Sequence, residues 1–207
     1  DKPVSMIDEF AFTERNVVLP KSRLLKFFTA INSLNAGKQV GQFLLENGHR
    51  NIAYFSCFTR YPWALKRLEG LRYSYEQAGL SSGVHYFCPE ADFPELSMGD
   101  QRYEIMFRAV EKAINICSNG PRKSGSVLAE AGSAAVSSAQ RTIMADKLGT
   151  FFTKAIQDPS ITAWVGANTE VALSCLEFLR EKEIHIPSKI TVMGFDDNQD
   201  AFYQGLT

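Results

Sequence analysis

The sequence predicts an α/β protein whose core is a doubly wound parallel sheet. Apolar runs of strand length alternate with apolar residues at helical spacing, which indicates parallel strands joined by right-handed helical crossovers. The 207 residues can bury a sizeable core, and the hydrophobic (45%) and charged (22%) contents are those of a globular domain. Because no apolar run approaches the roughly 20 residues that cross a bilayer, a membrane protein is not expected.

The first half of the chain is predicted to contain four strands and two helices. The strands are expected at residues 4–7, 27–31, 52–55 and 84–88. The first helix has its apolar residues at helical spacing and stops at Gly48. The second helix begins at Pro62, a favoured first-turn residue, and ends at Gly79. Its buried face is expected to consist of Ala64, Leu68, Leu71, Tyr75 and Ala78.

The second half is expected to alternate in the same way, except in one segment. A helix capped by Asp100 is predicted to close at Asn119 and Gly120. Residues 118–138 are rich in Ser, Ala and Gly, which favours a loop, with a short strand expected at 126–129. The remaining predicted elements are a helix ending at Asp158-Pro159, a buried strand at 163–166, a helix opened by Asn168 and a strand at 190–194.

Charge and motif content exclude several classes of function. The 22 basic and 23 acidic residues leave a net charge of −1, so this stretch lacks the basic excess of a nucleic-acid surface. Four cysteines without a CxxC pair predict neither a zinc site nor a disulfide framework and fit a reducing, cytoplasmic compartment. The three histidines have no metal-ligand spacing, and GPRKSG at residues 120–125 lacks the ending of a phosphate loop. We therefore expect no metal, cofactor or catalytic residue, and a chain that opens with Asp1 and is a piece of a longer protein.

Polar side chains that follow the predicted strands mark a candidate binding site. Ligands of open parallel sheets bind beyond the carboxyl ends of the strands. Asp8, Asn168 and Asp196 each come just after a predicted strand, and Arg67 lies early in the helix that follows another. Carboxylates accept protons from sugar hydroxyls, while an amide and a guanidinium supply donors in fixed planes. These four residues are therefore the predicted ligand-binding set.

Each of these residues also has a simpler interpretation. Asn168 is a strong helix N-cap and needs no ligand to explain it. Arg67 could be an ordinary solvated side chain at a helix edge. Asp196 and Asp197 could be turn residues, or an acidic pair that binds magnesium in a phosphotransfer domain.

Four segments in order resemble the effector domain of LacI/GalR-type transcriptional regulators. The resemblance extends over nearly the whole chain, from a strand similar to the family's opening IPVV-x-ID pattern to the final Leu206-Thr207. The segments that carry it are LENGHRNIA at residues 45–53, RLEG at 67–70, ANTEVA at 167–172 and IPSKITVMGFDD at 186–197.

The resemblance implies a periplasmic-binding-protein-like fold in which two doubly wound lobes close over a small molecule. Residues 1–31 would be the tail of the first lobe and the hinge crossing, and residues 32–207 a three-layer α/β/α second lobe. It carries ligand contacts to Asp8, Arg67, Asn168 and Asp196. Thr169 departs from the family's usual Asp, and the aromatic wall of the site has only Phe58, Trp63 and Trp164 as candidates. Trp164 lies in an apolar strand, which favours core packing.

Three classes of function follow. The first is the ligand-sensing domain of a cytoplasmic, homodimeric regulator that binds a sugar or similar effector and controls DNA through a LacI-type or GntR-type head absent from this chain. An allosteric coupling of about 1–3 kcal/mol would suffice for such a regulator or repressor. The second is an extracytoplasmic sugar-binding protein of a transporter or sensor. The third is a magnesium-dependent enzyme or phosphoacceptor that uses Asp196 and Asp197. No nucleophile, general base or phosphate cradle accompanies this pair in the sequence.

Overall fold

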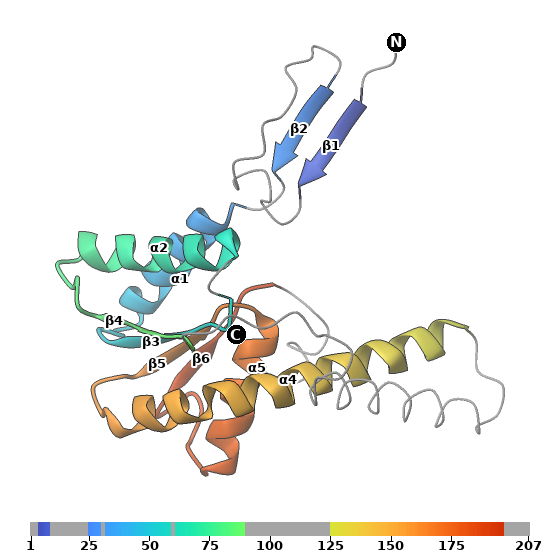
Figure 1. Cartoon of the computed structure of the whole chain (residues 1–207). Helices are drawn as coiled ribbons and strands as arrows, with labels where there is room; N and C mark the ends of the chain where they lie inside the picture. The colour runs from blue at the N-terminus through green and yellow to red at the C-terminus, as the bar shows by residue number, and fades with distance from the viewer. Residues whose placement is uncertain (1–3, 9–24, 30–31, 59–60, 90–124, 197–207) are drawn as a thin grey trace.

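The computed structural model describes residues 4–8, 25–29, 32–58, 61–89 and 125–196, with side chains from residue 32 onward except in 125–140. Helices and strands alternate along the chain in the order shown in Figure 1. The elements are β1 (Val4–Asp8), β2 (Leu25–Thr29), α1 (Ser33–Glu46), β3 (Ile52–Phe55), α2 (Pro62–Gln77), β4 (Val84–Phe87), α4 (Gly125–Gln157), β5 (Ala163–Gly166), α5 (Thr169–Glu181) and β6 (Thr191–Met193).

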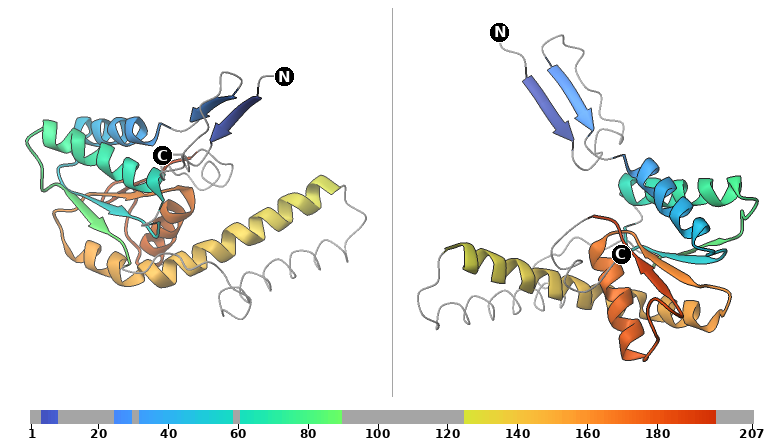
Figure 2. Two further views of the ribbon diagram at one scale, coloured as in Figure 1. Left: turned by 45° about the horizontal axis from the view of Figure 1, so that its top comes forward. Right: turned by 180° about the vertical axis from the view of Figure 1, so that it is seen from behind.

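The strands form two parallel sheets. Strands β1 and β2 pair with each other, and Asp8 at the end of β1 lies opposite Thr29. The larger sheet has the order β4-β3-β5-β6, in which every neighbouring pair is parallel. Helices α1 and α2 cover one face of this sheet and α4 and α5 cover the other (Figures 1 and 2). The predicted α/β class, with a doubly wound parallel sheet in a three-layer lobe, is confirmed.

Alternate residues of the strands supply two separate hydrophobic cores. In β3, Ile52 and Tyr54 pack toward α1 and α2, whereas Ala53 and Phe55 pack toward α4 and α5. This is the two-residue period of a strand covered on both faces. Trp164 of β5 is fully buried and lies within 5.6 Å of the Phe152 ring, centroid to centroid, in the second core. Its predicted role in core packing is confirmed.

The predicted signals at Pro62, Gly48 and Gly79 lie at helix ends. Pro62 occupies the first turn of α2, and Asn32, which was not predicted, caps α1 by accepting a hydrogen bond from the Asn35 amide at 3.0 Å. Both helices end before a glycine with positive φ, Gly48 at 85° and Gly79 at 73°. Such a backbone conformation favours glycine, because a Cβ would be strained there.

Two predictions are wrong among the described residues. Ala78 is the exposed C-cap of α2 and not part of its buried face, because the helix ends at Gln77. Residues 125–138 are neither a loop nor a short strand but the beginning of α4, a helix of 33 residues. Alanine has the highest helix propensity, and no proline interrupts the sequence from 125 to 157. The alanine residues therefore outweigh the Ser and Gly residues that favour a loop. The expected helix at 100–120 and residues 118–124 lie outside the described residues.

Two glycines allow α1 and α2 to pack backbone against backbone. A Cβ at Gly70 would lie 2.7 Å from the backbone nitrogen of Lys38 and closer still to the Leu34 carbonyl oxygen. A Cβ at Gly37 would collide with the carbonyl group of Arg67. The crossing therefore fixes α2 on α1 at the turn that carries Arg67.

None of the helices that the structure describes combines the length and hydropathy that a membrane span requires.

Candidate functional site

The carboxyl ends of β3, β5 and β6 meet at one edge of the larger sheet. The crossover that leaves β3 uses α2 on one face, and the crossover that leaves β5 uses α5 on the other. Such a reversal of strand order opens a crevice in doubly wound sheets, and ligands bind there. The backbone amide of Ala167, just beyond β5, donates to the Phe55 carbonyl at 2.8 Å and holds the two strand ends together.

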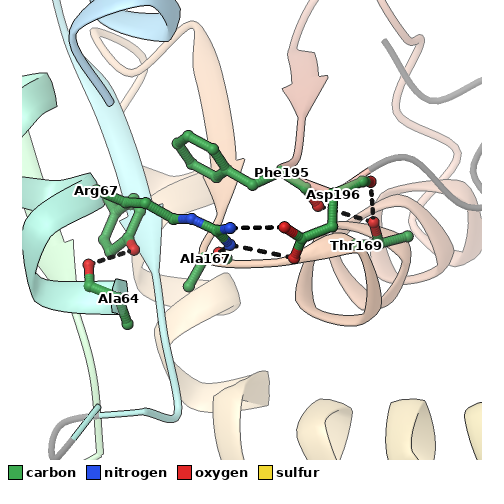
Figure 3. A network of polar contacts seen from close by, with 7 residues as sticks. Ala64, Arg67, Ala167, Thr169, Phe195 and Asp196 are labelled. Atoms are coloured by element: carbon green, nitrogen blue, oxygen red, sulfur yellow. Dashed lines mark hydrogen bonds and ion pairs between the residues drawn. The ribbon is translucent and has the colours of Figure 1, made fainter. Parts of the chain in front are cut away.

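Arg67 is the buried centre of this edge. Its side chain is only 5% exposed. Its Nη1 donates to the Ala167 carbonyl at 2.6 Å and to Oδ2 of Asp196 at 3.2 Å, and its Nη2 donates to Oδ1 of Asp196 at 2.6 Å (Figure 3). The guanidinium therefore joins α2 to the segments that follow β5 and β6, and a solvated position at a helix edge is excluded.

Aromatic rings and a buried tyrosine set the position of this guanidinium. The Cζ atom of Arg67 lies 4.9 Å from the centroid of the Trp63 ring and 4.7 Å from that of Phe195. Tyr54 of β3 donates its hydroxyl to the Ala64 carbonyl in the first turn of α2 at 2.8 Å. Because burial raises the pKa of Tyr54, the phenol stays protonated and keeps this donor. The start of α2 is thereby attached to the sheet.

Asp196 exposes its carboxylate beside the buried arginine. Its side chain is 54% exposed, although both carboxylate oxygens accept hydrogen bonds from Arg67. Its backbone adopts φ of 71°, a conformation that is strained for a residue other than glycine. Thr169 directs its hydroxyl at the carbonyls of both Phe195 (2.8 Å) and Asp196, and it is 3% exposed. The single hydroxyl proton is shared by two carbonyls and secures the strained turn.

The other two predicted residues have different surroundings. Asn168 follows β5 at the same edge, and its Oδ1 accepts from the Val171 amide at 3.0 Å, so the predicted N-cap of α5 is confirmed. Asp8 ends β1 in the smaller sheet, and its side chain lies outside the described ones. The structure thus brings Arg67 and Asp196 into direct contact, and Asn168 directly follows Ala167, whose carbonyl accepts a hydrogen bond from Arg67.

Three aromatic rings cluster at the start of α2, and two of them, Phe58 and Trp63, were candidates for an aromatic wall that could not be placed from the sequence. Phe58 lies 5.0 Å from Trp63 and 5.7 Å from Tyr61, centroid to centroid. Trp63 in turn packs on Arg67, so the cluster adjoins the ion pair. Sequence reasoning missed Tyr61. Its position directly before Pro62, after a buried strand, is the signal that could have identified it.

The chemistry at Asp196 is that of a hydrogen-bond acceptor. A magnesium ion would have to compete with the bidentate guanidinium for the same two oxygens. Within the described part of the chain, no three His, Cys, Asp or Glu side chains are grouped as metal ligands. Asp197, the second member of the acidic pair, lies outside that part.

Replacing Thr169 by valine is expected to lower the free energy of unfolding by about 1–2 kcal/mol. Valine keeps the volume but leaves the carbonyls of Phe195 and Asp196 without their donor. Urea denaturation measures the change. Thr169→Ser retains the hydroxyl and is expected to stay much closer to the wild type. Equal losses for the two variants would show that the hydroxyl has no such role.

Comparisons of sequence relate the chain to a known domain family and a regulator. The family described as "Periplasmic binding protein-like domain" matches residues 84–206, which is more than half of the chain. A protein of Mycolicibacterium smegmatis described as an HTH-type transcriptional regulator is 42% identical over 50 residues. That alignment covers 24% of this chain and 14% of the relative.

Solved structures share the fold. A LacI transcriptional regulator from a Rhodococcus species matches with a TM-score of 0.59 and 17% identity, over 99% of this chain and 54% of that one. A LacI family regulator from Enterococcus faecium with bound ribose matches with a TM-score of 0.54 and 14% identity, over 97% of this chain and 52% of that one. The chain therefore spans about half the length of these two structures.

Proposed function

We infer that this chain, which belongs to the periplasmic binding protein-like domain family, is the ligand-sensing part of a LacI-type bacterial transcriptional regulator. A small molecule bound between two lobes would favour one hinge angle and so control the spacing of two DNA-binding heads. The observation that carries the proposal is the Arg67–Asp196 pair, whose exposed carboxylate lies at the carboxyl edge of a doubly wound sheet. The regulator relative from M. smegmatis and the shared fold of LacI-family structures support it.

The chemistry of the edge favours a sugar or a similar polar molecule. Asp196 would accept protons from ligand hydroxyls, and Arg67 would hold the carboxylate in place. Asn168 would contribute amide groups from the start of α5. Trp63 and its aromatic neighbours would cover an apolar face of the ligand. The Enterococcus faecium structure contains ribose, which is consistent with this class of effector.

The organisation of the chain follows from the same proposal. Residues 1–31 would belong to the first lobe and the hinge crossing, since β1 and β2 form a sheet of their own. Residues 32–207 would be the second lobe, and Asp8, which ends β1, would reach the ligand from the other side. The regulator would be a cytoplasmic homodimer, with its DNA-binding head, of LacI or GntR type, outside this chain.

The test is effector binding coupled to DNA binding by the full-length protein. Neutral monosaccharides, disaccharides and nucleobases are screened by thermal shift, and operator fragments are selected from the protein's own genome. We expect a compound that stabilises the protein and changes its operator affinity at least about fivefold, which is the lower end of ordinary allosteric coupling. Asn168→Ser, which keeps the helix cap and removes the amide, is expected to weaken effector binding while the operator affinity of the unliganded protein stays the same.

Two results would count against the proposal. A compound that binds without any DNA binding by the full-length protein would favour the extracytoplasmic sugar-binding protein. Operator binding that no small molecule changes would remove the effector role.

A further inference from the structure

The contact between α4 and α5 contains a group of charges that is largely shielded from water. The two helices lie side by side on one face of the larger sheet (Figures 1 and 2). Arg141 of α4 binds two carboxylates of α5. Its Nη1 lies 3.1 Å from Oε2 of Glu170, and its Nε lies 3.2 Å from Oε1 of Glu177. The side chains of Arg141 and Glu170 are 12% and 13% exposed, against 43% for Glu177, so the pair with Glu170 is the buried one.

A hydroxyl joins the two helices at the same point. Ser174 is fully buried, and its Oγ lies 3.0 Å from the Glu170 carbonyl oxygen and 3.3 Å from the Arg141 carbonyl oxygen. Removing charges from water is costly unless they are paired in good geometry, so apolar packing alone does not explain this arrangement. The first turn of α5 is thereby attached to α4 at a defined position.

That first turn carries two residues of the candidate site. Glu170 directly follows Thr169, whose hydroxyl is directed at the carbonyls of Phe195 and Asp196. Asn168, the N-cap, comes directly before Thr169. Because backbone hydrogen bonds join the residues of a helical turn, a displacement of Glu170 would carry its two neighbours with it.

We propose that Arg141 is a positioning residue of the effector site and acts through Glu170 by fixing the first turn of α5. The effect is exerted through Asn168 and Thr169 and requires no contact between Arg141 and the effector. Glu177 lies about two helical turns further along α5, so its ion pair holds a part of the helix that is remote from the site. The inference rests on the proposed function, because it states what holds that site in place.

Two matched substitutions on α5 test this role. Glu170→Gln and Glu177→Gln each remove one carboxylate and leave Arg141 paired with the other, so neither variant leaves the guanidinium without a partner. Native-state hydrogen exchange of the full-length protein is measured at the amides of Val171 and Ala172, which donate to Asn168. We expect Glu170→Gln to accelerate this exchange about three- to tenfold, and Glu177→Gln to change it less than about twofold.

The tryptophan that packs on Arg67 reports whether the site itself responds. The Trp63 ring lies 4.9 Å from Cζ of Arg67. In protein labelled with fluorotryptophan, the fluorine resonance of this residue is assigned by its loss in Trp63→Phe. We expect Glu170→Gln to shift the resonance and Glu177→Gln to leave it in place. An ion pair with a purely structural role would affect the free energy of unfolding in both variants without this difference.

Arg141→Gln separates the ion pair from the helix dipole. Glu170→Gln also removes a negative charge from the amino end of α5, where the dipole favours one, whereas Arg141→Gln keeps that charge. Both variants are expected to accelerate exchange in the first turn and to shift the Trp63 resonance. Equal exchange rates in Glu170→Gln and Glu177→Gln, or an unmoved Trp63 resonance in Arg141→Gln, would overturn the proposal. Because these measurements need neither effector nor operator, failure here is distinguishable from failure of the regulator assignment.

Discussion

Replacing Arg67 with alanine is expected to weaken effector binding at least tenfold and to lower the free energy of unfolding by about 2–3 kcal/mol. The variant loses hydrogen bonds to Ala167 and Asp196 and leaves a gap between the Trp63 and Phe195 rings. Lost packing of a buried arginine stem adds to the lost hydrogen bonds. Because the carboxylate of Asp196 is half-exposed, water can solvate it afterwards, and we expect the fold to persist. Calorimetric titration and urea denaturation measure the two effects.

Two further variants test whether the expected losses come from the guanidinium at position 67. Arg67→Lys keeps the charge but cannot donate to both oxygens of Asp196 in the planar fork, so an intermediate loss of affinity is expected. Arg72→Ala removes an exposed arginine from the same helix and is expected to change neither quantity by much. Unchanged effector affinity in Arg67→Ala, in a protein that still unfolds cooperatively, would exclude Arg67 from the site.

Outside residues 125–138, the order and type of the described elements could be predicted because their sequence signals are local. The strand at Ala163–Gly166 is a short apolar run bounded by turn residues, and Asn168 is an N-cap before an apolar stripe. The prediction for residues 125–138 failed because this segment has no such local signal. Its Ser, Ala and Gly residues show no hydrophobic period, and composition alone does not distinguish a helix of small residues from a loop.

Which side chains lie at the carboxyl edge of the sheet could be predicted, but their geometry could not. Strand ends gave Asn168 and Asp196, because the carboxyl edge of a parallel sheet follows from topology. The burial of Arg67 could not be found this way, since it depends on the Phe195 ring, which is far from it in sequence, as well as on its helix neighbour Trp63. The role of Thr169 was missed as well. It depends on two carbonyls 26 and 27 residues away, and no local pattern encodes such a contact.

Gly70→Ala is expected to destabilise the protein by about 2–4 kcal/mol, although alanine is the better helix former. The added methyl group would collide with the backbone of α1 at Leu34 and Lys38. Backbone cannot move aside as the end of a flexible side chain can, so the two helices must separate. Because Arg67 lies one turn before Gly70, the shift of α2 would also carry the guanidinium away from Asp196. Weaker effector binding is therefore expected together with the loss of stability.

The matched control is Gly149→Ala in α4, where an added Cβ meets no atom within 4 Å. This glycine also lies within a helix, so the same substitution should stabilise by up to about 1 kcal/mol through helix propensity. Urea denaturation of the two variants should therefore give free-energy changes of opposite sign. If both were stabilising, α1 and α2 would not be packed through their backbones, and the crossing would not be what positions Arg67. If Gly70→Ala lowered stability but left effector affinity intact, the position of α2 would be separable from the binding site.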